Sequence, residues 1–96
     1  MNDGISADAG LIILSELARQ TDGRANDLVL DRVLVAHGVR RSRDWLRTQL
    51  NRLAELEAVK VETIGSIAVA TLRAAGRDHV ERRRLLEGVS RPADEA

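Results

Sequence analysis

The sequence predicts a small α+β domain in which two helices and a β-hairpin follow one another closely. Apolar residues recur with helical spacing in RDWLRTQLNRLAEL, so that three of its leucines form one stripe: Leu46, Leu50 and Leu53. Apolar and polar residues alternate over residues 59–64, and Gly65-Ser66 then provides a two-residue turn, as in a β-hairpin. Only the short segment 38–41 separates the leucine-striped helix from an earlier amphipathic segment. Such a connection forces the two helices to cross steeply, which makes the order a helix-turn-helix followed by a hairpin.

Length and composition limit the class of protein. A chain of 96 residues forms one domain, and 44% hydrophobic with 31% charged residues is typical of a globular protein. Cysteine is absent, which excludes a disulfide framework, a thiolate metal site and a cysteine nucleophile. The apolar runs are too short to cross a membrane, and the first residues lack the basic start of a signal peptide. We therefore expect a cytoplasmic domain ordered over about residues 6–88, with flexible termini at residues 1–5 and 89–96.

Charge is balanced overall but is not evenly distributed. The 15 basic and 15 acidic residues give a net charge of zero, whereas residues 1–39 carry a net charge of −3. Residues 40–52 contain five arginines and one aspartate, a local net charge of +4 that coincides with the turn and the leucine-striped helix. Because charges in physiological salt are screened beyond about 8 Å, this local patch matters more to a polyanion than the distant acids do.

The first helix is expected to begin near Ser6 or Asp8 and to end at about Gln20. Four consecutive bulky residues start at Leu11 and wrap most of its circumference, and Leu17 follows one turn later. One small core rarely covers so much apolar surface, so we expect part of residues 11–17 to face a second copy of the chain in a homodimer. The alternative is that a neighbouring tail of the same chain covers this surface.

The elements that follow are marked by caps and turns. Asn26 caps a helix that runs to about Ala36, after a stub strand at Arg24-Ala25, and Ser42 caps the leucine-striped helix over residues 42–56. Residues 59–64 and 67–72 form the hairpin, and a last helix is expected from Ala74 through about Leu86. This last helix is rich in arginine that alternates with acids, which favours a solvated, salt-bridged surface, with a subunit contact as the alternative.

Three stretches carry a family resemblance: GRANDLVLDRVL, GVRRSRDWLRTQLNRLAEL and the terminal GVSRP. Together with the order of elements over residues 6–86, they make the chain similar to the winged helix-turn-helix domain of bacterial and phage transcriptional regulators. Within that superfamily the chain resembles the small ArsR-like winged-helix proteins of mutator-type transposable prophages. The resemblance implies that the helix at residues 42–56 enters the major groove of double-stranded DNA and that the hairpin is a wing over the neighbouring backbone.

On this interpretation the exposed side of the helix and the turn before it supply the DNA contacts. Arg43 and Arg47 lie one turn apart and suit a guanine edge or successive phosphates, and Asn51, one turn further, suits adenine. Thr48 suits a thymine methyl group, while the arginines of the turn suit phosphates, because loop arginines at a groove edge meet the backbone first. The full candidate set is Arg40, Arg41, Ser42, Arg43, Arg47, Thr48, Asn51 and Arg52. The alternative is that these side chains are simply solvated.

Other functions have less support in the sequence. No serine lies in a nucleophile-elbow context and no glycine-rich loop could hold phosphates, so neither an enzyme nor a cofactor is expected. The two histidines, His37 and His79, form no ligand pair at i, i+4 spacing, which argues against a metal site, and His37 is expected to cap a helix end. Trp45 is expected to pack against a neighbouring element. A winged-helix module that binds another protein instead of DNA is the alternative function.

Overall fold

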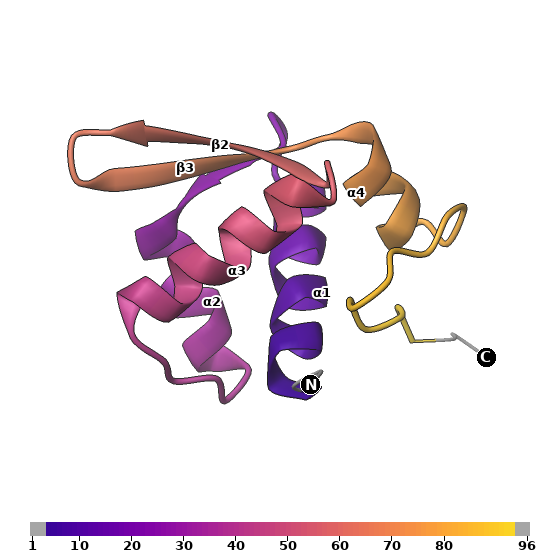
Figure 1. Cartoon of the computed structure of the whole chain (residues 1–96), viewed down its shortest axis with the longest axis horizontal. Helices are drawn as coiled ribbons and strands as arrows, with labels where there is room; N and C mark the ends of the chain where they lie inside the picture. Colours follow the sequence, from indigo (N-terminus) through magenta and orange to yellow (C-terminus); the bar gives the residue numbers. More distant parts are fainter. Residues whose placement is uncertain (1–3, 94–96) are drawn as a thin grey trace.

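Four helices and a three-stranded antiparallel sheet make up residues 4–93, the part of the chain that the computed structural model describes. In chain order the elements are α1 (Gly4–Arg19), β1 (Arg24–Asn26), α2 (Asp27–Ala36), α3 (Arg43–Glu55), β2 (Val59–Ile64), β3 (Ile67–Leu72) and α4 (Ala74–Val80). The hairpin turn lies at one end of the molecule, and α4 and the loop after it lie at the other (Figure 1). The domain is α+β, as predicted, and its arrangement is compatible with a helix-turn-helix and wing.

The helices α2 and α3 begin at the caps that the sequence predicts. The Val29 amide donates to Asn26 Oδ1 at 2.9 Å at the start of α2, and the Trp45 amide donates to Ser42 Oγ at 3.1 Å at the start of α3. Gly38 follows α2 with a φ of 84°, a left-handed conformation that a residue with a side chain would adopt only with strain. The second and third helices are therefore confirmed close to their predicted bounds.

β3 is the central strand of the sheet, whose order is β1-β3-β2. Arg24 of β1 lies opposite Thr71 of β3, which confirms the stub strand. β2 pairs with β3 along its whole length, and Gly65 turns the chain between them with a φ of 61°. Successive strand residues point to opposite faces, and the buried Ala68 and Ala70 of β3 belong to the face that packs on the helices.

The leucine stripe of α3 faces the core of the domain, as its periodicity predicts. Leu46, Leu50 and Leu53 are at most 1% exposed and join one apolar cluster with residues of α1, α2 and the sheet. Each fully buried leucine side chain stabilises the fold by about 1.5–3 kcal/mol relative to an exposed one. Trp45 is half-buried against this cluster, which confirms the packing role expected for it.

Two helices differ from the prediction in their bounds. α1 starts at Gly4, ahead of both predicted caps, and the expectation for residues 1–3 falls outside the described residues. α4 ends at Val80 rather than at about Leu86, so the predicted length of the last helix was wrong. Arg82 adopts a left-handed φ of 63°, which an α-helix cannot contain, and the chain turns back there.

The four-residue apolar run of α1 is only partly free for a second subunit. Ile13 and Leu14 are fully buried in the core of their own domain. Leu11 and Ile12 are half-buried and pack against the edge of that core. Leu17 is fully buried as well, so three of the five apolar residues that led us to expect a homodimer are covered within one chain.

The loop after α4 returns to the core. Leu86 and Val89 are 9% and 6% exposed, and the Ser90 amide donates to the Ala7 carbonyl of α1 at 3.0 Å. The Ser90 hydroxyl also donates to Asp8 Oδ1. Val89 and Ser90, which the sequence analysis assigns to a flexible tail, are thus packed against α1, while residues 94–96 lie outside the described part.

His79 of α4 fixes this loop from inside the domain. Its side chain is fully buried, and the Leu86 amide donates to His79 Nδ1 at 2.9 Å. Because Nδ1 accepts that bond, the ring proton lies on Nε2, which donates to the Ser90 carbonyl at 2.8 Å. Both polar atoms of the buried ring are satisfied by the loop, so His79 has a structural role rather than that of a metal ligand.

Candidate nucleic-acid interface

The exposed side of α3 lies beside the hairpin and is polar. Asp44, Thr48, Asn51 and Glu55 are all exposed, and the Thr48 hydroxyl donates to the Asp44 carbonyl at 3.0 Å. The sequence predicts this side correctly for Thr48 and Asn51. Its two acids leave it without positive charge of its own, so the positive charge of this region lies in the arginines at its edges.

Arg43 and Arg47 are directed at a buried carboxylate at the start of α2. Arg43 Nε donates to Asp27 Oδ2 at 3.3 Å, and Arg47 donates to the same oxygen from Nε at 3.3 Å and from Nη2 at 3.2 Å. The Asp27 side chain has no exposed surface, whereas the side chains of Arg43 and Arg47 are 47% and 36% exposed. One negative charge therefore offsets part of the positive charge of this arginine pair.

The same two arginines hold the hairpin turn. Arg43 Nη2 donates to the Ser66 carbonyl at 3.1 Å, and Arg47 Nη2 donates to the same oxygen. We refer to Asp27, Arg43, Arg47 and Ser66 as the Asp27 clamp. The clamp ties the start of α2, the exposed edge of α3 and the turn of the hairpin together, so the position of the hairpin relative to α3 is fixed by charge-assisted hydrogen bonds.

The charge state of Asp27 follows from its surroundings. Burial raises the pKa of a carboxyl group, because it removes the ionised form from water. Hydrogen bonds from Arg43 and Arg47 outweigh that effect and hold the pKa of Asp27 below its ordinary value of 3.8. The Ala68 backbone amide lowers the pKa further, although it makes no hydrogen bond of standard geometry to Asp27 Oδ1, which has no partner among the described residues. Asp27 is ionised at neutral pH, and the clamp is intact there.

Arg52 does not belong to the exposed side of α3, where the helical periodicity placed it. Its Nη2 donates to the Ser6 carbonyl and its Nη1 to the Gly88 carbonyl, both at 2.9 Å, and its Nε donates to Gln49 Oε1 at 3.2 Å. The predicted orientation of Arg52 was therefore wrong. The side chain joins α3 to the first turn of α1 and to the loop after α4, and this arrangement gives it a structural role.

Arg40 and Arg41 remain exposed in the turn before α3. Arg41 Nη1 donates to the Arg40 carbonyl at 3.2 Å, and the Arg41 guanidinium lies 5.7 Å from the centre of the Trp45 ring. Stacking on the indole holds the Arg41 side chain near the start of α3 without neutralising its charge. Ser42, the third candidate of this turn, uses its hydroxyl as the cap of α3.

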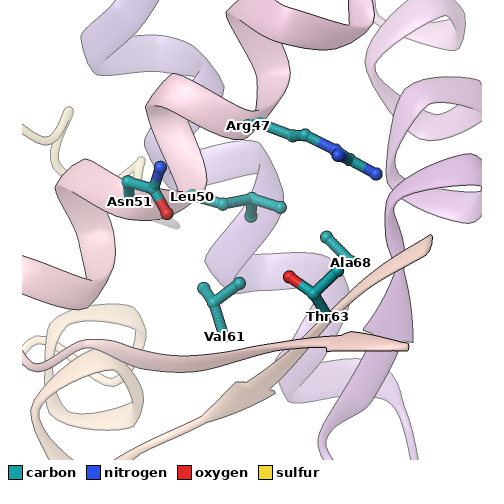
Figure 2. A pocket seen from close by; sticks show the side chains of 6 residues that line it. All are labelled: Arg47, Leu50, Asn51, Val61, Thr63 and Ala68. Atoms are coloured by element: carbon teal, nitrogen blue, oxygen red, sulfur yellow. The ribbon is translucent and has the colours of Figure 1, made fainter. Parts of the chain in front are cut away.

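A small pocket lies between α3 and the hairpin. Figure 2 shows that Arg47, Leu50 and Asn51 reach it from α3, and that the hairpin contributes three lining residues: Val61, Thr63 and Ala68. Its volume of about 190 Å³ is below the roughly 300–1,000 Å³ that sites for cofactors and substrates occupy. The pocket is thus a groove between helix and hairpin that a single chemical group can enter.

In the part of the chain that the structure describes, histidine and carboxylate side chains do not gather into a metal site. Within residues 4–93 no three histidine, aspartate or glutamate side chains come together in a way that could hold a metal ion. His37 Nδ1 lies 2.9 Å from the Val33 carbonyl, as expected for a side chain that caps the end of α2.

Sequence reasoning missed Asp27 and Ser66 as parts of the site. The available signal for Asp27 was its position in the first turn of α2. An aspartate is favourable at a helix N-terminus by itself, so its presence there gave no reason to expect an arginine partner. Ser66 takes part through its backbone carbonyl, and the type of residue at a position does not predict such a role.

The fold is that of a small α+β domain in which the Asp27 clamp fixes the hairpin beside α3. No helix in the described part of the chain is long and apolar enough to cross a membrane. No family model matches the sequence. A protein of Escherichia phage Mu, described as uncharacterized protein gp26, is 38% identical over 96 residues, which cover 100% of this chain and 99% of the phage protein. The chain belongs to the family of this Mu protein.

Proposed function

We propose that the protein is a winged-helix, DNA-binding transcriptional regulator that presents α3 to the major groove of duplex DNA. The observation that carries the proposal is the Asp27 clamp, which fixes the hairpin beside the exposed Thr48 and Asn51 of α3. A helix and a hairpin held in one orientation form a preorganised surface, and preorganisation lowers the entropy lost on binding. The kinship with a phage protein is consistent with this proposal.

The proposal assigns different roles to the candidate residues. Arg40 and Arg41 contact phosphates, while Thr48 and Asn51, on the exposed side of α3, face the base edges. Arg43 and Arg47 act first as clamp residues, and their exposed portions can still donate to DNA. Ser42 and Arg52 support α3 and are not required to touch DNA: Ser42 caps the helix, and Arg52 anchors it to its neighbours.

The phosphate role of the turn predicts a specific salt dependence. The double variant R40Q/R41Q is expected to bind every duplex more weakly and to reduce the slope of log K against log salt by about 2, because each lost phosphate contact lowers it by about one. Asn51→Ala should instead leave that slope unchanged and alter the sequences selected from a random duplex pool. Fluorescence anisotropy across a salt titration measures the slope, and sequencing of the selected pool measures the preference.

The matched control removes two positive charges elsewhere. Arg19 and Arg24 are exposed, and neither lies in the turn or on α3. R19Q/R24Q should therefore retain the wild-type slope. Equal losses in R40Q/R41Q and R19Q/R24Q would mean that overall charge, rather than the turn before α3, attracts the duplex.

We also propose that two copies of the chain pair through the edge of α1. A cleft between α1 and α2 is lined mainly by apolar groups, among them the half-buried Leu11, Ile12 and Val33. We expect the protein to sediment at micromolar concentrations with twice its 10.5 kDa mass, and Ile12→Glu to sediment as a monomer because it places a charge in that interface. A monomeric wild-type protein would contradict the dimer and leave DNA binding by one α3 possible.

A protein-interaction module is the second candidate. Two observations favour it: Asp27 offsets part of the charge of Arg43 and Arg47, and Ile64 at the end of the hairpin is 61% exposed. The same salt titration separates the two functions. Absence of duplex binding at low salt would favour the interaction module over the DNA-binding regulator.

A further inference from the structure

α4 and the loop after it lie at the opposite end of the molecule from the hairpin turn (Figure 1). With the residue just before α4, they carry a second group of arginines. We call it the arginine surface, and all of its side chains belong to exposed residues: Arg73, Arg77, Arg82, Arg83, Arg84 and Arg91. The same stretch, residues 73–91, contains only three acids, which leaves a net charge of +3. The proposed role of α3 does not use this surface.

The members of the arginine surface fall into three pairs. Arg73 and Arg84, together with the exposed Glu57, line one cleft next to the C-terminal end of α3, and Arg82 and Arg91 line a second one. Arg77 and Arg83 are joined through Glu81, which lies 3.9 Å from Arg77 Nη1 and 3.5 Å from Arg83 Nε. Three pairs of guanidinium groups are therefore arranged around one helix and one loop.

The backbone that carries the central arginines is held in place. The Arg83 amide donates to the Asp78 carbonyl at 2.8 Å, and the Arg82 amide donates to the His79 carbonyl at 3.1 Å. Beyond the turn, the buried His79 ring binds the Leu86 amide. The arginines are thus presented from an ordered turn, which reduces the entropy lost when they bind a partner.

Five of the six arginines of this surface, all but Arg82, are at most weakly paired with acids of residues 4–93. Among residues 4–93 no acid lies within ion-pair distance of Arg73, Arg84 or Arg91. Glu81 pairs with Arg77 and Arg83 at the exposed surface, where such ion pairs contribute little and a multivalent anion readily displaces them. Guanidinium groups bind phosphate oxygens through two parallel hydrogen bonds, which a point charge cannot do.

We propose that the arginine surface is a second DNA-binding surface, which contacts the phosphate backbone of duplex DNA independently of base sequence. This inference rests on the proposed function, which makes duplex DNA the partner of the protein. It adds to that function a set of DNA contacts that lie outside the reach of α3. Arginines cluster at both ends of α3, with Arg40 and Arg41 before it and Arg73 and Arg84 at its C-terminal end. A helix of this length spans about 20 Å, so the two clusters meet the duplex at separate phosphates.

The test is a salt titration of the full chain on a short mixed-sequence duplex, with R83Q/R84Q compared with wild type and with R19Q/R24Q. We expect R83Q/R84Q to reduce the slope of log K against log salt by about 2, equally for all sequences, while the control keeps the wild-type slope. Circular dichroism should show the same thermal unfolding for R83Q/R84Q and wild type, because both side chains are exposed. A wild-type slope in R83Q/R84Q would overturn the proposal.

The salt titration distinguishes the arginine surface from the turn before α3. A reduced slope in R83Q/R84Q together with an unchanged slope in R40Q/R41Q would support the arginine surface and overturn the phosphate role of the turn before α3, and the converse would do the opposite. Poly-glutamate serves as a second probe. If it competes with the duplex as effectively per charge as unlabelled duplex does, the surface recognises acidic polymers in general, and the assignment to phosphates is overturned.

Discussion

Asp27→Asn is expected to lower the free energy of unfolding by about 2 kcal/mol at neutral pH, the usual contribution of hydrogen bonds to a charged group. The variant keeps the shape of the side chain and removes the negative charge of the group that accepts hydrogen bonds from Arg43 and Arg47. The hairpin turn should also become more mobile, because the same guanidinium groups hold the Ser66 carbonyl. Urea unfolding followed by the fluorescence of Trp45, the single tryptophan, measures the first effect, and amide exchange in the hairpin measures the second.

Asp31→Asn is the matched control for this variant. Asp31 lies on the same helix and is partly exposed, and no arginine of the described residues lies within ion-pair distance of it. We expect its effect to stay within about 0.5 kcal/mol, as for most surface substitutions. Similar losses in both variants would show that the charge of α2, and not the clamp, is responsible.

The contribution of Asp27 should depend on pH in one direction. Its pKa in the folded protein lies below the ordinary value of 3.8, so folding favours the ionised form. The stability that this carboxylate contributes is therefore complete above the unfolded pKa of about 3.9 and is lost as the pH falls through the folded value. The difference in unfolding free energy between wild type and Asp27→Asn should be constant near neutral pH and narrow below about pH 4. A difference that persists unchanged in acid would contradict the role of the ionised carboxylate.

The elements that sequence reasoning predicted well depend on neighbours along the chain. Asn26 and Ser42 cap helices through contacts three residues away, and the stripe of Leu46, Leu50 and Leu53 follows from the helical period alone. The hairpin required only strand alternation and a glycine at its turn. Local physics determined these features, and the structure has them close to where the sequence placed them.

The orientation of the arginines could not be predicted in the same way, because their partners are distant in sequence. Asp27 precedes Arg43 and Arg47 by 16 and 20 residues, and Gly88 follows Arg52 by 36. A helical projection assigns side chains to faces of one helix and contains no information on carbonyl groups brought to it by other elements. The same limit applies to α4, whose end depends on Leu86 returning to the core.

These contacts change how the charge of residues 40–52 should be interpreted. The net charge of +4 in this segment includes two arginines that share the buried Asp27 and a third, Arg52, that anchors neighbouring loops. Arg40 and Arg41 are exposed members whose charge no acid within residues 4–93 offsets, and Arg43 and Arg47 together keep a net charge of +1 beside Asp27. We propose that the arginine surface on α4 and its loop adds cations to those of this segment when the domain binds duplex DNA.

Gly76→Ala is expected to destabilise the fold by about 3 kcal/mol, at the upper end of overpacking in a closely packed interior. A Cβ atom at this position would lie 2.4 Å from the Ala58 carbonyl oxygen and 2.8 Å from Leu72 Cδ1. The Ala58 oxygen cannot easily move, since it accepts from the Arg73 amide at 2.9 Å where the chain enters α4. For a domain of this size the midpoint of thermal unfolding should fall by roughly 12–24 °C, measured by circular dichroism.

Gly4→Ala makes the same chemical change where there is room for it. No heavy atom lies within 4 Å of the position that its Cβ would occupy, and the residue begins α1. Because alanine also favours helix more than glycine does, the midpoint should stay the same or rise slightly. If Gly76→Ala unfolded at the same temperature as Gly4→Ala, α4 would not be docked against Ala58. The arginine surface would then lack the fixed support that its proposed contact with phosphates requires.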